Sequence, residues 1–316
     1  MITRFIRNSL QKKTGYYAAI LGSSPSKGAR SPLLWNAVFQ EKTIPAQYLA
    51  FDIDSDNNLK KAIDYLKNDP YFIGGSVTIP YKEIVMPFLD DLHESAECGA
   101  INCLYRNQPG KLSGMNTDGL GAVQSLKQSV DFQNLLVNQK NLNVLIWGAG
   151  GVARAIATAL LIEKEFLIKS VTVGFFSTGR VESWKSIASK LSYSNRLSLK
   201  MMTGIKSESK KFDLIIQCTP VGSALSELED LSPFGDERTL EVLSTKDAVF
   251  FDVNYAPLQS LAMSHWKKIR SSKPLNGLDM NRLQAVIAFD QVLEGVSWLG
   301  TQKMSLLEIE TIMKQC

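Results

Sequence analysis

Short apolar runs and helical patterns of apolar residues alternate along this chain of 316 residues. A continuous apolar run predicts a buried strand, whereas apolar residues recurring every three or four positions predict a helix. In the first part of the chain, strands are expected at 16–22, 47–51, 72–80 and 100–106, and helices at 32–41, 59–66 and 82–89. This repeated order of strand and helix predicts a parallel α/β sheet.

A second series of strands and helices begins at residue 143. Strands are expected at 143–147, 170–176, 197–202, 213–217 and 248–253, and helices at 182–191, 280–293 and 304–313. A further helix is expected to begin near residue 117, with Thr117 or Asp118 as its cap. Because the chain is longer than one typical domain, two α/β domains are expected.

Residues 143–158, NVLIWGAGGVARAIAT, combine a strand, a glycine-rich turn and a helix. Gly148, Gly150 and Ala153 match the G-x-G-x-x-G/A pattern, whose small residues allow a tight turn and close approach of a pyrophosphate. The helix that opens there presents unpaired N–H groups and the positive end of its dipole to an anion. Such turns also occur without a ligand in buried strand–helix joints, so the pattern needs its structural context.

The composition is that of a globular protein, with 45% apolar and 21% charged residues. The net charge of +4 is too small and dispersed for a nucleic-acid surface, although it favours anionic small molecules. No apolar run approaches the roughly 18 residues that span a bilayer. Residues 1–13 are basic without the apolar core of a secretory signal. An ordinary extension and a cytoplasmic protein are therefore expected.

Cysteine and histidine offer little material for metal binding. The four cysteines form no CxxC pair and are expected to be reduced thiols: Cys98, Cys103, Cys218 and Cys316. With His93 and His265 alone, neither a histidine-based zinc site nor a Ser-His-Asp triad is expected.

Eight motifs, in order along the chain, resemble those of the shikimate dehydrogenase family. They are Ser31-Pro32, SVTIPYK at 76–82, GAIN at 99–102, MNTDG at 115–119, GAGGVAR at 148–154, TPVG at 219–222, DVNYAPL at 252–258, and Gly277 with Met280 and Gln284. The resemblance implies a substrate-binding and catalytic domain from residues 1–117 and 281–316, and a Rossmann-type dinucleotide-binding domain from 118–280. It also implies an NADP-dependent oxidoreductase that interconverts 3-dehydroshikimate and shikimate.

Hydride transfer at an alcohol carbon needs a proton relay at the same oxygen. By resemblance, Lys82 and Asp118 are the catalytic pair; without it, Lys82 would be a surface charge and Asp118 a helix cap. The resemblance assigns substrate binding to Ser31, Ser76, Thr78, Asn102, Tyr255 and Gln284. Each of these could instead be a buried polar group with a partner in the protein, and Tyr255 a core residue.

The resemblance assigns cofactor binding to thirteen residues: Gly148, Ala149, Gly150, Gly151, Val152, Ala153, Ser177, Thr178, Arg180, Thr219, Pro220, Gly277 and Met280. NAD-binding domains carry an acidic residue about 20 positions after the glycines, and none follows the strand at 170–176. NADP is therefore expected, with NAD possible, because Phe175 and Phe176 replace the Asn and Arg of the family's phosphate-binding loop.

The substrate end also departs from the family pattern. Ala29 stands where the family has the first of two carboxylate-binding serines, and Ser76 stands where it has Asn. Arg30 is a candidate replacement donor for a carboxylate, or a solvent-facing charge. The expected partner is a small cyclic hydroxy acid, shikimate or alternatively quinate, bound by a monomer or homodimer. A non-catalytic ligand sensor on the same fold is the competing class.

Overall fold

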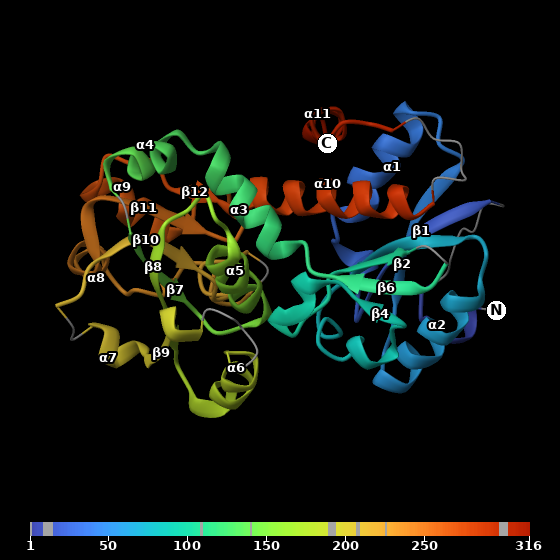
Figure 1. The fold of residues 1–316 in the computed structure, drawn as a ribbon, viewed down its shortest axis with the longest axis horizontal. Coiled ribbons are helices and arrows are strands. Elements are labelled where there is room, and N and C mark those ends of the chain that lie inside the picture. Colours follow the sequence, from blue (N-terminus) through green and yellow to red (C-terminus); the bar gives the residue numbers. More distant parts are fainter. Residues whose placement is uncertain are drawn as a thin grey trace. The chain divides into compact units, whose positions relative to one another are not determined.

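The structure is a computed structural model that describes residues 2–8, 15–107, 110–139, 141–188, 194–206, 209–224, 226–296 and 303–316. It divides into two compact units, each with its own sheet (Figure 1). The first unit contains residues 1–117 and 282–316, and the second contains residues 118–281. Within the described residues, every helix is too short or too polar to cross a membrane.

The sheet of the first unit has six strands in the order β2-β1-β3-β5-β6-β4. Their bounds are β1 Tyr16–Gly22, β2 Ala46–Asp52, β3 Phe72–Val77, β4 Asp91–Leu92, β5 Cys103–Arg106 and β6 Leu112–Met115. The strands β1, β2 and β3 are parallel, but β5 is antiparallel to both β3 and β6. The expected parallel pairing therefore holds for β1, β2 and β3, whereas β5 is added antiparallel to both of its neighbours, and a short connection joins it to β6.

Helices of the first unit are α1 Ser31–Glu41, α2 Asp56–Asn68 and α11 Leu306–Lys314. The long helix α10, Gly277–Gly295, begins in the second unit and continues into the first, where Phe289 packs against Trp35 and Phe39 of α1. The predicted helix at 82–89 is wrong. That segment forms turns and a short 3₁₀ helix, Met86–Phe88. Pro87 has no N–H for an α-helical bond, and its ring would clash with the carbonyl four residues earlier.

Strand β2 lies at the edge of its sheet, and two asparagine side chains cover its outer backbone groups. Asn36 of α1 accepts from the N–H of Tyr48 at 2.7 Å and donates to its carbonyl at 3.1 Å. Asn8 accepts from the N–H of Asp52 at 2.9 Å and donates to the carbonyl of Ala50 at 2.8 Å. An asparagine amide thus supplies the donor and acceptor that a neighbouring strand would otherwise provide.

The sheet of the second unit is parallel throughout, in the order β12-β11-β10-β7-β8-β9. Its strands are β7 Leu142–Trp147, β8 Ile168–Phe175, β9 Leu197–Met201, β10 Phe212–Gln217, β11 Ser244–Asp252 and β12 Leu275–Asn276. Its helices are α3 Asp118–Gln128, α4 Val130–Asn138, α5 Gly151–Ile162, α6 Val181–Ala188, α7 Met202–Lys206, α8 Glu237–Leu243 and α9 Leu261–Ile269. This is the doubly wound order, in which strands after β7 are added first on one side of it (β8, β9) and then on the other (β10, β11, β12).

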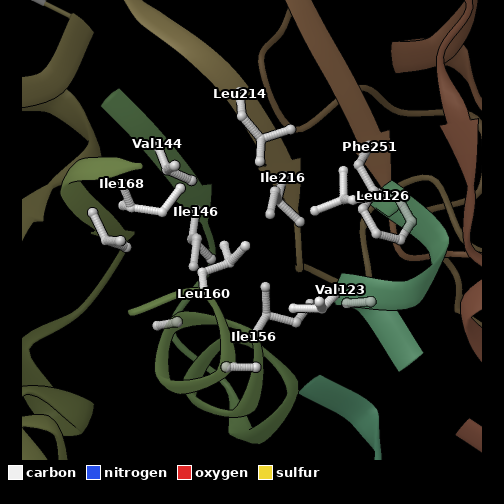
Figure 2. Packing of buried hydrophobic residues seen from close by; sticks show 14 of the residues in the cluster. Val123, Leu126, Val144, Ile146, Ile156, Leu160, Ile168, Leu214, Ile216 and Phe251 are labelled. Carbon is white, nitrogen blue, oxygen red and sulfur yellow. The ribbon is translucent and has the colours of Figure 1, made fainter. Parts of the chain in front are cut away.

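Side chains from the sheet and from helices α3 and α5 form one apolar core (Figure 2). Val144 and Ile146 of β7 lie in its centre, and Ile156 and Leu160 of α5 pack onto them. The helix can approach this closely because its inward positions follow the 3.6-residue period, which brings them to one face. The core therefore holds the glycine turn at the start of α5 at a fixed place beside the sheet.

Candidate functional site

Three of the polar side chains in the first unit form one buried hydrogen-bonded cluster. Asn102 donates to Thr117 Oγ1 at 3.0 Å and to Gln284 Oε1 at 3.2 Å, and its own Oδ1 accepts from the Thr117 N–H at 2.7 Å. Asn102 and Thr117 are buried, while Gln284 is half-buried. Asn102 and Gln284 were assigned to substrate by resemblance, and the structure brings them together; Thr117, which the sequence indicated only as a cap, joins them.

A second polar cluster connects the two serines assigned to substrate. The hydroxyl of Tyr48 donates to Ser76 Oγ at 2.8 Å and also hydrogen-bonds the side chain of Ser31. Burial raises the pKa of the Tyr48 phenol well above its usual value, so the hydroxyl stays neutral and acts as a donor. Sequence reasoning missed Tyr48, since its only signal was a tyrosine within an apolar strand, which needs a partner when buried.

Lys82 lies in the series of turns that follows β3. Its carbonyl accepts from the Ile101 N–H at 2.7 Å, and Thr78, four residues earlier, donates its N–H to the Leu21 carbonyl at 2.8 Å. The preceding residue, Tyr81, donates its hydroxyl to the Ile53 carbonyl at 3.0 Å. The backbone that carries the half-buried Lys82 is thus fixed to β1, to the residue after β2 and to the segment before β5.

Asp118 is the first residue of α3 and is 7% exposed. It directly follows Thr117, whose N–H is bound by Asn102. The residue before, Asn116, donates to the Ala100 carbonyl at 3.0 Å. The chain leading to Asp118 is therefore held by the same segment, 100–102, that holds the carbonyl of Lys82.

In the second unit, the glycine turn lies between the ends of three neighbouring strands. Gly148 has a φ of +120° and donates its N–H to the Gly174 carbonyl at 3.0 Å. A side chain there would meet the carbonyl carbon of Cys218 at 2.9 Å. At Gly150 no atom lies within 4 Å of the place where a Cβ would stand. This open position at the start of α5 fits a pyrophosphate group approaching the helix N–H groups.

Other residues of the turn differ in exposure. Ala153 is fully buried, Ala149, Gly151 and Val152 are half-buried, and the Ala149 carbonyl accepts from the Trp184 indole at 3.1 Å. Ala153 therefore serves close packing of the helix on the sheet, as its small size predicts.

The loop after β10 is held from two sides. Gln217 donates to the carbonyls of Thr219 and Val221 at 3.0 and 2.9 Å, and Asn254 donates to the same two carbonyls at 3.2 Å. The carbonyl of Asn254 in turn accepts from the Gly277 N–H at 3.1 Å. These bonds thus hold Thr219, its neighbour Pro220 and Gly277 at the carboxyl ends of strands in the second sheet.

Two further residues assigned by resemblance belong to this unit. Tyr255, half-buried, follows Asn254 in the segment after β11. Met280 is 6% exposed and belongs to the apolar core of the second unit, so packing already accounts for its position. Their roles toward substrate and cofactor stay predictions.

At the end of β8 no carboxylate is present in the stretch 175–178. Phe176 is 61% exposed, and Ser177 and Thr178 are also exposed. The side chain of Arg180 lies outside the described residues. The glycine turn lies at the carboxyl ends of the strands. At the carboxyl end of the neighbouring strand β8, the exposed groups are therefore one aromatic ring and two hydroxyl groups.

Asp252, at the end of β11, is fully buried. Burial raises the pKa of its carboxyl to about 6, although the Ser260 hydroxyl at 2.6 Å and the Asn254 N–H at 3.0 Å donate to it. The carboxylate thus costs stability at neutral pH while it fixes the start of the Asn254 segment.

We expect Asp252→Asn to change how stability depends on pH. Burial raises the pKa of this carboxyl from 3.8 to about 6 in the folded protein. Its contribution to the free energy of unfolding is therefore fully present below about pH 4 and is lost as the pH rises through 6. The difference in free energy of unfolding, variant minus parent, should therefore increase by roughly 3 kcal/mol between pH 4 and pH 7. Urea unfolding at several pH values measures it.

The control is Asp247→Asn, which removes an exposed carboxyl of the same strand. It should leave the pH dependence as in the parent. A constant difference between Asp252→Asn and the parent from pH 4 to 7 would show that this carboxyl is not titrating in that range.

All four cysteines are free, and the described residues contain no group of three or more His, Cys, Asp or Glu side chains placed to hold a metal ion.

Comparison with known proteins gives consistent matches. The family model for the shikimate dehydrogenase substrate binding domain matches residues 21–104. The shikimate dehydrogenase (NADP(+)) of Methanocaldococcus jannaschii is 33% identical over 267 residues, which are 84% of this chain and 87% of that protein. The one from Lysinibacillus sphaericus is 31% identical over 286 residues, 89% of this chain and 91% of that protein. A crystal structure of a shikimate dehydrogenase in complex with NADP⁺ has a TM-score of 0.73 at 27% identity and 97% coverage of both chains.

Proposed function

This chain belongs to the shikimate dehydrogenase family, and from that premise we propose that it catalyses the reversible NADP-dependent reduction of 3-dehydroshikimate to shikimate. One observation carries the proposal. The segment Ile101–Asn102 supports the backbone beside both catalytic candidates. The Ile101 N–H donates to the carbonyl of Lys82. The Asn102 side chain accepts from the N–H of Thr117, the residue before Asp118. A shared backbone support of this kind suits two groups that act on one oxygen.

In the proposed reaction, residues 148–153 would hold NADP, which would supply or accept the hydride. Lys82 gives a proton to the substrate oxygen during reduction and takes it back during oxidation. Asp118 orients the Lys82 ammonium and the substrate hydroxyl. Asn102, Gln284 and Thr78 hydrogen-bond the ring hydroxyls, and such a site rejects analogues that lack a hydroxyl.

The test is an absorbance assay of nicotinamide reduction with shikimate and quinate, each with NADP and with NAD. We expect the largest kcat/KM for shikimate with NADP. Faster turnover of quinate would reassign the substrate, and faster turnover with NAD would reassign the cofactor. Binding of the acids without turnover of either one would favour a ligand sensor.

Arg30 is the proposed donor to the substrate carboxylate, in place of the serine that Ala29 replaces. Its Nη1 atom is buried and has no hydrogen-bond partner among the described residues. Because a hydrogen bond to a charged group contributes roughly 1.5–3 kcal/mol, Arg30→Ala should raise KM for the acid about 10- to 100-fold with little change in KM for NADP. Initial-rate kinetics measures both constants.

The control is Lys27→Ala, which removes an exposed charge from the same loop. If both variants raise KM equally, the loop acts only through its overall charge. If neither does, the carboxylate binds elsewhere.

Phe176 is the proposed contact for the adenine ring. In doubly wound sheets the adenosine half of a dinucleotide lies at the end of the strand next to the glycine turn, which here is β8. Stacking of a base on an aromatic ring contributes about 1–3 kcal/mol, so Phe176→Ala should weaken NADP and NAD equally, by roughly tenfold. Fluorescence titration of the purified protein measures the two dissociation constants.

Leu167→Ala is the matched control, since Leu167 is 52% exposed at the opposite end of the same strand. It should bind both cofactors as the parent does. Unchanged binding in Phe176→Ala would remove the ring from the cofactor site.

A further inference from the structure

The segment Ile2–Asn8 is attached to the first unit at several points. Ile2 is 4% exposed in the apolar core of this unit, and Phe5 and Ile6 pack against the same core. The Arg7 N–H donates to the Asp52 carbonyl at 2.8 Å, and Asn8 binds the edge of β2 at Ala50 and Asp52. These contacts make the segment part of the folded unit.

The same segment reaches the loop that precedes Ser31. The Arg7 guanidinium donates to the Ser23 carbonyl at 2.7 Å. Ser23 is the first residue after β1, and the loop runs from there through the 3₁₀ helix Pro25–Lys27 to Arg30. One end of the loop is therefore bound by Arg7, a residue that belongs to none of the family motifs.

The middle of the loop is bound by Asp52, which is 7% exposed. One carboxylate oxygen accepts from the Ser26 N–H at 2.9 Å, and the other accepts from the Ser26 hydroxyl at 2.5 Å. Because Asp52 is also the residue whose N–H and carbonyl are bound by Asn8 and Arg7, the segment fixes the position of this carboxylate.

We propose that Ile2–Asn8 and Asp52 form a positioning element for the loop Ser23–Arg30, and that Arg7 and Asp52 thereby set the affinity for the acid substrate without touching it. The inference rests on the proposed function, in which Arg30 and Ser31 bind the carboxylate. A loop that is already ordered loses less conformational freedom when it binds a ligand. The KM for the acid substrate is therefore lower. The hydride and proton transfer steps do not involve this element, so kcat should be unaffected.

The experiment compares Arg7→Ala, Asp52→Asn and the control Arg4→Ala. Arg4 is an exposed arginine of the same segment, and among the described residues no hydrogen bond or ion pair connects it to the loop. We expect Arg7→Ala to raise KM for the acid three- to tenfold and Asp52→Asn to raise it further, because the Arg7 contact is exposed, whereas the two Asp52 contacts are half-buried. KM for NADP and kcat should stay within twofold of the parent, and Arg4→Ala should match the parent throughout. Arg7→Lys should recover part of the loss, since a lysine ammonium can still donate to the Ser23 carbonyl.

Hydrogen exchange of the protein without substrate provides a second readout that does not depend on the substrate's identity. Amides of residues 23–34 should exchange faster in Arg7→Ala and Asp52→Asn than in the parent, while those of residues 142–162 stay unchanged. If no acid is turned over at all, the proposed function fails, and faster exchange confined to 23–34 still supports the positioning element. Unchanged exchange in 23–34, or KM values for acid and NADP that rise together, would overturn it.

Discussion

Lys82→Ala should lose about 10²- to 10⁴-fold in kcat, the usual cost of removing a proton-transfer group. NADP should bind as in the parent, because the proposed cofactor contacts lie in the second unit. The substitution removes only the side chain, since the carbonyl of Lys82 keeps its bond to Ile101 and the turn keeps the Tyr81 contact to Ile53. Single-turnover kinetics together with a cofactor titration separates the two effects.

Lys60→Ala, on the exposed face of α2, is the control for loss of a lysine charge in the same unit. It should retain full activity. A Lys82→Ala protein whose kcat stays within tenfold of the parent would exclude Lys82 from proton transfer and leave Asp118 as the remaining candidate.

Gly75→Ala should destabilise the first unit by roughly 2–6 kcal/mol, from backbone strain and overpacking together. Gly75 has a φ of +147°, and an added Cβ would overlap the carbonyl oxygen of Ala19 and lie 2.7 Å from its nitrogen. Both neighbours are backbone atoms of β1, so no side-chain rotation can relieve the overlap. Since whole domains are stable by about 5–15 kcal/mol, much of the protein should be unfolded or insoluble at 37 °C.

Gly28→Ala tests whether glycine replacement in this unit is harmful in general. Gly28 has an extended φ of 172°, and no atom lies within 4 Å of its added Cβ. We expect its urea midpoint to equal that of the parent. A urea midpoint of Gly75→Ala equal to that of the parent would mean that β1 and β3 can move apart at little cost. The close pairing of these strands would then not explain the short distance between Ser76 and Tyr48.

Features with a local cause were predictable from the sequence. The glycine turn could be located because a strand, a tight turn and a helix each leave their own pattern within 16 residues, and the parallel sheet of the second unit follows from that order. The order of the motifs indicated the shikimate dehydrogenase family. That resemblance assigned both Asn102 and Gln284 to substrate binding, and their side chains are hydrogen-bonded to each other. These two residues are 182 positions apart, so spacing alone does not bring them together.

Features that depend on long-range pairing could not be predicted. The bond from Tyr48 to Ser76 joins two strands that are not neighbours in the sheet, and nothing in either segment signals the other. Arg106 is a similar case, since it donates to five carbonyls, at Leu66, Lys67, Asp69, Phe72 and Gly110, and so binds the end of α2 from a strand far away in the sequence. The helix expected at 82–89 failed for a local reason, because the helical spacing was counted across Pro87.

The asparagine pair on β2 also bears on how copies of this chain meet. Asn36 and Asn8 occupy backbone groups at Tyr48, Ala50 and Asp52, the alternate positions that an edge strand turns outward. An unoccupied edge of this length is a template for strand addition by another molecule, and for aggregation. With these groups already bonded, the first sheet cannot grow through β2, so at high concentration this edge resists the strand-to-strand association that an uncovered parallel edge would invite.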